Sequence, residues 1–283
     1  MNIVKVHSLG NDFLIVDEAE KKDLADPGAA ARRVCERHTG IGADCLLLIN
    51  IKDKNQGIVD FRVFNADGTE SELSGNGLRC AAAYLRYLKK IDSPRILFQT
   101  IVGQRQCDLV SDKDNLFEFK TEMGIPHLNS NDIPFDDGSE YEKIIDYPLS
   151  IQHKVYPITV VSMGNPHCAI FFDRYPSRIE WQQIGQEIEH HPFFPNRTNI
   201  EFIRVHNPKE IEVLFWERGV GETMSSGSGS CAAAVAAILK GLTEKTVTVH
   251  TSMGTLTVEW EGDVVHQIGP SEVVFAGSYI PET

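Results

Sequence analysis

The strongest constraint on this chain is an internal repeat. Three pairs of similar motifs occur in the same order, and the members of each pair are 151 to 154 residues apart. The pairs are Gly10-Asn11 with Gly164-Asn165, Ser74-Gly75-Asn76-Gly77 with Ser226-Gly227-Ser228-Gly229, and Thr100-Ile101-Val102-Gly103 with Thr251-Ser252-Met253-Gly254. Ordered matches at nearly one spacing indicate a duplicated domain and not a short-period repeat array. If the two halves face one another, both Ser-Gly-x-Gly loops point into one shared cleft. Such a two-faced site suits a reaction that removes a proton from one face of a carbon and returns one to the other.

Length and composition agree with two ordinary globular domains. The chain has 283 residues, of which 42% are hydrophobic and 24% are charged. Its net charge of −13 argues against nucleic acid as a partner. Residues 1–17 do not resemble a signal peptide, no apolar run approaches the roughly 18 residues of a membrane span, and the six cysteines follow no metal or disulfide pattern. We therefore expect a cytoplasmic protein with reduced thiols, without a metal and without a membrane or nucleic-acid partner.

The predicted fold is α/β (α+β), in which each half is a β-sheet or barrel wrapped around one central helix. The runs Leu78 to Leu88 and Ser230 to Leu239 are Ala-rich and apolar on nearly every side, which is typical of buried helices. Gly28 to His38 and Trp181 to His190 are amphipathic and are predicted as outer helices. We place the two domains at residues 1–125 and 126–283, with a polar linker over Pro126 to Pro148. Segments rich in β-branched and aromatic residues predict strands at 61–64, 96–98, 158–161, 211–215 and 246–249.

Each Ser-Gly-x-Gly loop precedes a predicted helix and is a candidate anion site. The first N–H groups of a helix have no intrahelical partner, and glycine lets a ligand approach the backbone closely. A single such loop is better explained as a tight strand-to-helix connection, but two matched loops before two buried helices favour ligand binding. Polar segments precede both loops, at residues 65–70 and 217–223. Their Asn, Glu and Arg side chains suit a ligand that carries both an ammonium group and a carboxylate.

These segments resemble the signatures of the diaminopimelate epimerase family. Asn65-Ala66-Asp67-Gly68-Thr69-Glu70 followed by Gly75-Asn76-Gly77-Leu78-Arg79-Cys80 is similar to the first signature. Glu217-Arg218-Gly219-Val220-Gly221-Glu222-Thr223 followed by Gly227-Ser228-Gly229-Ser230-Cys231 is similar to the second. Further blocks at residues 7–13, 39–44 and 162–167 extend the resemblance from Lys5 to about Gly277.

The resemblance implies a reaction that needs no pyridoxal phosphate or other cofactor. LL-2,6-diaminopimelate and its meso form interconvert, in lysine and peptidoglycan biosynthesis, when one cysteine removes the α-proton and a second protonates the opposite face. The substrate α-carboxylate is expected on the backbone amides of Gly75-Asn76 and Gly227-Ser228. The family also implies that a strand near residues 271–277 completes the first domain, and a homodimer is the candidate assembly. The distal end of the substrate is expected to meet Asn11, Asn65, Asn165, Asn199, Glu217 and Arg218, all of which match the family.

Two positions depart decisively from the family pattern. The resemblance places the catalytic cysteines at Ser74 and Ser226, and both are serine here. A hydroxyl is a far weaker acid than a thiol, and no neighbour in the sequence is recognisable as a base that would activate it. We therefore expect the chain to be inactive, or nearly so, in epimerisation. Cys80 and Cys231 are not expected to substitute, because they lie further along the buried helices.

Two explanations account for the serines. One is an engineered replacement of both cysteines that captures substrate without turnover, which the complete set of distal residues favours. The other is a natural relative with lost or changed chemistry, either an isomerase for another amino acid or an amino-acid-binding protein without turnover.

Five further residues carry separate expectations. Ser8 stands where the family often has Gly, and Cys45, where it has Gln or Gly, is expected at the border of the site. His167 either forms a hydrogen bond within the site or has a structural role in the Asn-Pro-His turn. Glu70 and its repeat equivalent Glu222 are expected to brace the two loops.

Overall fold

The computed structural model describes residues 1–18 and 26–280, which divide into two compact units. Unit 1 comprises Met1–Glu122 and the segment that begins at Ile268, and unit 2 comprises Met123–Gln267. The C-terminal segment therefore belongs to the same unit as the N-terminus. The last three residues of the second predicted domain, 281–283, lie outside the described residues.

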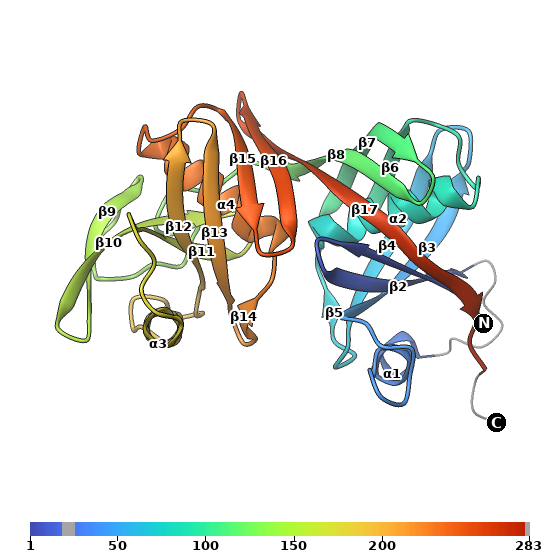
Figure 1. The fold of residues 1–283 in the computed structure, drawn as a ribbon, viewed down its shortest axis with the longest axis horizontal. Helices are drawn as coiled ribbons and strands as arrows, with labels where there is room; N and C mark the ends of the chain where they lie inside the picture. Colours follow the sequence, from blue (N-terminus) through green and yellow to red (C-terminus); the bar gives the residue numbers. More distant parts are fainter. Residues whose placement is uncertain (19–25, 281–283) are drawn as a thin grey trace. The chain divides into compact units, whose positions relative to one another are not determined.

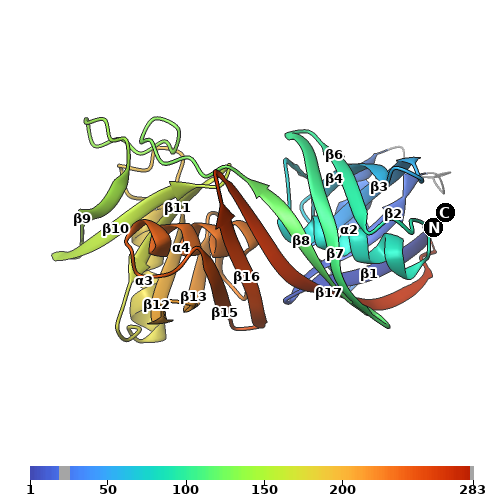
Figure 2. The ribbon, with the colours of Figure 1, turned by 90° about the horizontal axis from the view of Figure 1, so that it is seen from above.

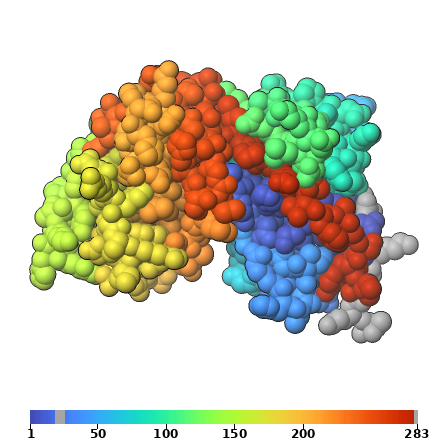
Figure 3. All heavy atoms as spheres, in the orientation of Figure 1, coloured from blue at the N-terminus to red at the C-terminus, as the bar shows by residue number. Residues whose placement is uncertain are grey.

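Within the described residues, eight strands of unit 1 pair in a closed ring. The ring runs in the order β1, β2, β3, β4, β6, β7, β8 and β17, and β17 pairs again with β1. In the space-filling view the red C-terminal strand lies against the blue N-terminal strands (Figure 3). The eight strands of the ring are β1 (Asn2–Ser8), β2 (Asn11–Asp17), β3 (Cys45–Asp53), β4 (Ile58–Asn65), β6 (Arg95–Thr100), β7 (Gly103–Lys113), β8 (Leu116–Gly124) and β17 (Val264–Ser278), and the short strand β5 (Glu70–Ser71) pairs with β4.

Helix α2 (Gly75–Tyr87) is surrounded by this ring (Figures 1 and 2). Its residues from Gly75 to Leu85 are all buried, as expected for a helix that is apolar on nearly every side. Strand β8 shows the complementary pattern, because every second residue is buried, including Phe117 and Phe119. The aromatic side chains of the ring and the small side chains of the helix therefore form one core.

Unit 2 repeats this topology around helix α4 (Gly227–Leu239). The five pairings that begin with β1 and β2 in unit 1, and the five that begin with β10 and β11 in unit 2, run antiparallel, parallel, antiparallel, parallel, antiparallel. Residues 229–237 of α4 are buried, so this helix is also central to its unit. The strands are β9 (Ile144–Ile151), β10 (Lys154–Ser162), β11 (Pro166–Phe171), β12 (Asn199–Asn207), β13 (Glu210–Glu217), β14 (Gly221–Thr223), β15 (Thr246–Thr251) and β16 (Gly254–Glu261).

The predicted strands and central helices are confirmed, but the ends of the outer helices differ. Helix α1 (Pro27–Val34) ends before the predicted His38, because the Val34 carbonyl accepts the N–H groups of Ile41 and Gly42 at 2.9 and 3.0 Å. Helix α3 (Arg178–Glu189) begins ahead of the predicted Trp181. A capping box between Ser177 and Glu180 starts it there.

The segment predicted as a polar linker, 126–148, is instead part of unit 2. Ile133 and Phe135 are buried in a core with residues of α3 and β12, and the last part of the segment belongs to strand β9. The expectation of a linker was wrong because the polar composition of the segment reflects Asp and Asn residues that face outward. A few apolar residues of the same segment attach it to the core of unit 2. In the described ranges, no helix is long and apolar enough to cross a bilayer.

Candidate active site

Ser74 and Ser226 are the N-cap residues of α2 and α4. Both have extended backbone conformations, with φ of −140° and −135°. The Ser74 hydroxyl accepts the Gly77 N–H at 3.0 Å, and the Ser226 hydroxyl accepts the Gly229 N–H at 3.3 Å. Serine is among the preferred N-cap residues, because its side-chain oxygen accepts a hydrogen bond from one of the first N–H groups, which have no acceptor within the helix. The glycines of both motifs thus form the first helical turn instead of a separate loop.

In unit 1, Asn11 links the start of β2 to the first turn of α2. Its Oδ1 accepts from Asn76 Nδ2 at 3.1 Å, and its own Nδ2 donates to Asp44 Oδ2 at 2.8 Å. Asp44 also accepts from Arg37 at 2.7 Å. The sequence-predicted residues Asn11, Gly75 and Asn76 are therefore brought together beside Ser74.

Asn65, at the end of β4, forms a second group in unit 1 with Cys45. The two residues are cross-strand partners, and the Cys45 thiol lies 3.6 Å from Asn65 Oδ1. Ser71 donates to the same oxygen at 3.1 Å, and Asn65 Nδ2 donates to Thr69 at 2.9 Å. Burial raises the pKa of the Cys45 thiol well above its ordinary value, so Cys45 is a neutral neighbour of Asn65.

Ser8 and Arg79 lie beneath the first turn of α2. Arg79 is fully buried and donates to Asn76 Oδ1, and also to the Ser8 hydroxyl at 3.1 Å. Ser8 in turn donates to the Pro270 carbonyl at 2.7 Å. The serine that departs from the family pattern therefore orients the arginine that holds Asn76.

In unit 2, Glu217 lies beside the hydroxyl of Ser226. Ser226 Oγ donates to Glu217 Oε2 at 3.4 Å, and Thr223 Oγ1 donates to Glu217 Oε1 at 2.6 Å. The expectation that no base lies near either serine is thus wrong for Ser226. Its partner sits nine residues upstream and reaches it through the β13–β14 hairpin, a proximity that the linear motif does not reveal.

Asn199 and Arg218 form a connected pair in unit 2. Asn199 Oδ1 accepts the backbone N–H of Arg218 at 2.9 Å, and Asn199 Nδ2 donates to the Pro166 carbonyl at 2.8 Å. The Arg218 guanidinium donates to the Asn196 carbonyl at 2.9 Å and is otherwise exposed. Nitrogen atoms of the guanidinium remain available for a carboxylate.

Asn165 contacts the buried side chain of His167. His167 Nε2 lies 3.0 Å from Asn165 Oδ1, and its Nδ1 lies 2.7 Å from Glu201 Oε1. Burial raises the pKa of Glu201, and the negative charge of Glu217 adds to this against the opposing effect of His167. Both roles expected for His167 are therefore combined, since it is a packed residue that also hydrogen-bonds a site residue.

The remaining predicted residues take structural positions. Cys80 and Cys231 are completely buried, and burial raises the pKa of Cys80 to about 12. Glu70 pairs with Arg62 at 2.7 Å, and Glu222 pairs with Arg178 at 2.8 Å. Each glutamate thus braces the hairpin that precedes its serine.

Sequence reasoning missed Asp44, Arg79 and Glu201. A detectable signal existed for Glu201, which is a lone acidic residue within the apolar run Ile200–Ile203 of β12. Arg79 had a similar signal as a charged residue in a helix predicted to be buried. In the part of the chain that the structure describes, no cluster of His, Cys, Asp or Glu is arranged to hold a metal ion.

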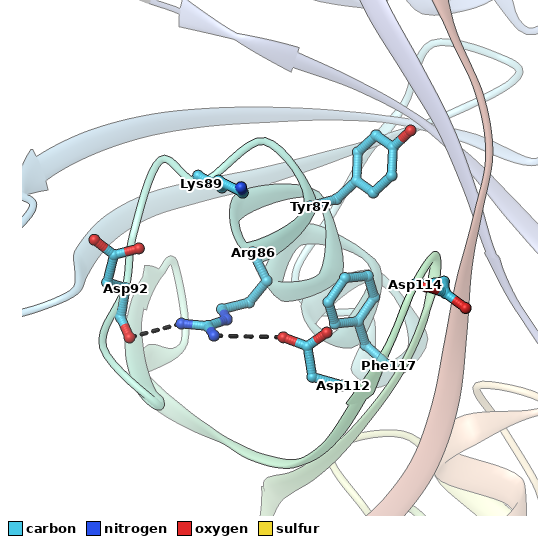
Figure 4. A pocket seen from close by; sticks show the side chains of 7 residues that line it. All are labelled: Arg86, Tyr87, Lys89, Asp92, Asp112, Asp114 and Phe117. Atoms are coloured by element: carbon cyan, nitrogen blue, oxygen red, sulfur yellow. Dashed lines mark hydrogen bonds and ion pairs between the residues drawn. The ribbon is translucent and has the colours of Figure 1, made fainter.

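A surface pocket of about 310 Å³ lies away from these residues, at the C-terminal end of α2 (Figure 4). Arg86 donates to the Asp92 carbonyl at 2.6 Å and to Asp112 at 3.4 Å, which satisfies its charge within the protein. None of the motif residues lines this pocket. It is therefore not the candidate active site.

Solved structures with this fold include a hydroxyproline epimerase and a predicted epimerase. A hydroxyproline epimerase from Agrobacterium vitis, with trans-4-hydroxy-L-proline bound, has a TM-score of 0.67 at 13% identity, over 98% of this chain and 90% of that one. A predicted epimerase from Pseudomonas aeruginosa has a TM-score of 0.68 at 15% identity, over 99% of both chains. At these identities the likeness confirms the fold alone.

Sequence relatives are much closer. The chain is 42% identical over 281 residues to the diaminopimelate epimerase of Pelotomaculum thermopropionicum, and 40% identical over 281 residues to that of Moorella thermoacetica. Both alignments cover 99% of each chain. The sequence model of diaminopimelate epimerase matches residues 3–128 and 159–274. The chain therefore belongs to the diaminopimelate epimerase family.

Proposed function

We propose that this chain binds 2,6-diaminopimelate on a scaffold for interconversion of the LL and meso forms, and that its two serines block the chemistry. The observation that carries the proposal is the duplicated helix N-terminus. Each unit has a buried central helix capped by serine, with amide or charged side chains of the same unit beside the cap. A zwitterionic amino acid offers the matching carboxylate and ammonium groups.

The α-carboxylate of the substrate would bind the N–H groups of Gly75-Asn76 and Gly227-Ser228. These groups lie in the first helical turns, where no intrahelical acceptor exists. Negative charge that develops on the carboxylate during proton removal would be stabilised by the same N–H groups. Arg218 and Glu217 would hold the charged groups of the distal end, together with Asn11, Asn65, Asn165 and Asn199.

The reaction requires one group that removes the α-proton and another that gives a proton to the opposite face. Ser74 and Ser226 occupy these positions. A serine hydroxyl must lose its own proton before it can act as a base, and a carboxylate such as Glu217 is too weak a base to remove it. The 3.4 Å contact between Ser226 and Glu217 therefore does not restore the activity.

A second candidate function is amino-acid binding without turnover in a natural relative. Both hydroxyls are engaged as helix caps, and serine caps a helix better than most residues. Serine at both positions is thus compatible with a binding site in which these residues stabilise the helices and take no part in acid–base chemistry.

Isothermal titration calorimetry of the unaltered chain tests the proposal. We expect saturable binding of LL- and meso-diaminopimelate, and at least tenfold weaker binding of lysine, which lacks the distal carboxylate that Arg218 would hold. Equal affinity for lysine would contradict the role assigned to the distal residues. Absence of binding to any of the three compounds would refute the proposed substrate.

A cytoplasmic location and a homodimeric assembly complete the proposal. Sedimentation velocity would show the dimer as a species of twice the 31.6 kDa chain mass. A single species at the chain mass would refute it.

A further inference from the structure

Glu201 is a buried carboxylate that is hydrogen-bonded to His167, a neighbour of the candidate site residue Asn165. The side chains of Glu201 and His167 are each 1% exposed, and Glu201 Oε1 lies 2.7 Å from His167 Nδ1. Glu201 Oε2 is buried as well and has no hydrogen-bond partner among the described residues. A carboxylate in this environment is costly when charged, unless it shares a proton with its neighbour.

The number of protons on this pair follows from its surroundings. His167 Nε2 faces Asn165 Oδ1 at 3.0 Å, and an amide oxygen can only accept, so this orientation of the amide goes together with a proton on Nε2. The short contact at Nδ1 requires a second proton, either on His167 or on Glu201. Both arrangements leave the pair without net charge. The alternative is an ionised Glu201 beside a neutral His167 whose only proton is on Nδ1. That arrangement would bury an uncompensated negative charge near Glu217.

The geometry points to Glu201 as a positioning residue for Asn165. We propose that Glu201 keeps a proton on Nε2 of His167, which fixes the amide of Asn165 with its oxygen toward His167. The amide nitrogen of Asn165 is then left to donate to the ligand. This inference rests on the proposed function, because it specifies the substrate group that Asn165 meets.

The free end of Asn165 distinguishes it from the other site asparagines. Both ends of Asn11 and both ends of Asn199 are engaged by protein groups. In residues 1–18 and 26–280, Asn165 Nδ2 donates to no protein acceptor, and the side chain is only half-buried. An N–H donor selects an acceptor, so the group that binds here is a carboxylate oxygen and not an ammonium.

Gly229 supports the same arrangement from the first turn of α4. A Cβ atom at Gly229 would lie 2.8 Å from Glu201 Oε1, closer than packing allows. Glycine at this position therefore leaves room for the carboxylate beneath the helix. Gly229 also faces Ser226 and Phe215, as its repeat equivalent Gly77 faces Ser74 and Phe61, but the three atoms nearest to a Cβ at Gly77 include no carboxylate oxygen.

The test compares Glu201→Gln with Glu201→Leu in the full chain. Glutamine can donate to His167 Nδ1 and preserve the Nε2–H tautomer, whereas leucine removes the partner. Imidazole ¹⁵N NMR reports the tautomer, and the signals of His167 are identified by their loss in His167→Gln. Titration with meso-diaminopimelate reports affinity, and thermal unfolding shows that each variant is folded. Glu210→Gln, an exposed carboxylate paired with His250, serves as the matched control.

We expect Glu201→Gln and Glu210→Gln to keep the Nε2–H tautomer and bind within about threefold of the unaltered chain. Glu201→Leu should show mixed tautomers and roughly tenfold weaker binding, the loss typical of one hydrogen bond to a charged group. A folded Glu201→Leu with an unchanged tautomer and affinity would overturn the inference. If the unaltered chain binds no diaminopimelate, the proposed function fails, and the tautomer in Glu201→Leu still decides whether Glu201 positions His167.

Discussion

The hydroxyl of Ser226 lies 3.4 Å from a carboxylate oxygen of Glu217, whereas the position in unit 1 that corresponds to Glu217 is an asparagine. The residue 152 positions before Glu217 is Asn65, which is neutral and bonds to Thr69 and Ser71. The two serine positions therefore share the same helix cap but differ in charge. A pair of acid–base groups placed there would be intrinsically unequal.

Single cysteine substitutions should reveal this inequality. In Ser74→Cys the helix N-terminus should lower the thiol pKa below about 8.5. In Ser226→Cys the neighbouring Glu217 opposes the same effect, so we expect a pKa at least about one unit higher than in Ser74→Cys. Ultraviolet absorbance of the thiolate against pH, relative to the unaltered chain, measures both values. Adding Glu217→Gln to Ser226→Cys should close the gap, and an equal or lower pKa at position 226 would contradict the account.

Removing either cap should weaken the chain. Ser74→Ala and Ser226→Ala each leave the N–H of Gly77 or Gly229 without its acceptor, and we expect a loss of about 0.5–2 kcal/mol in the free energy of unfolding. Urea titration at neutral pH gives this value. Ser150→Ala, at an exposed serine of β9, is the control and should change stability by less than about 0.5 kcal/mol. Cap variants as stable as the control would show that the hydroxyls do not cap the helices.

Asp12 should contribute stability that depends on pH. Burial would raise the pKa of its carboxyl, but hydrogen bonds from Arg37 and Lys5 lower it below the ordinary value. A carboxyl group whose pKa is lowered by folding stabilises the fold at pH values above its unfolded-state pKa of about 3.9. This contribution is lost as the pH falls through the folded-state pKa. Asp12→Asn should therefore cost about 1–3 kcal/mol at pH 7 and progressively less below about pH 4.

Acid and urea unfolding of both proteins measure this difference. Asp108→Asn is the control, because Asp108 forms an exposed pair with Arg95 and should contribute less than about 1 kcal/mol. A loss in Asp12→Asn that stays constant from pH 7 to pH 3 would refute the assignment.

Arg218 should be a principal source of substrate affinity. Its guanidinium is exposed apart from one bond to the Asn196 carbonyl, and Asn199 fixes its backbone. Arg218→Met retains much of the side-chain volume and removes the charge, so diaminopimelate should bind about 10- to 100-fold more weakly. Calorimetry measures the change. Arg204→Met, at an arginine paired with Glu212, should leave the affinity unaltered. Equal losses in both variants would indicate a general electrostatic effect instead of a specific contact.

Local sequence patterns predicted the repeat, the strands and the two buried helices. The helices could be predicted because a helix that is buried on every side is apolar along its whole length, and this is apparent from that one segment of sequence. The end of α1 could not be predicted, since the Val34 carbonyl is capped by residues that return from a later turn. The same limit applies to the site. Ser74, Asn76, Glu217 and Arg218 lie in recognisable motifs, but the contact between His167 and Glu201 depends on the parallel register of β11 and β12. The register between these two strands cannot be inferred from the sequence motif of either one.

The central claim is that a diaminopimelate epimerase scaffold is blocked by its two serines. Uptake of deuterium at the α-carbon of LL-diaminopimelate in D₂O, followed by NMR, tests it most directly in the unaltered chain and in the double variant Ser74→Cys with Ser226→Cys. The account predicts exchange in the double variant at least about 100-fold faster than in the unaltered chain. Comparable exchange in both proteins would contradict the block by serine, and no exchange in either would contradict the assigned reaction.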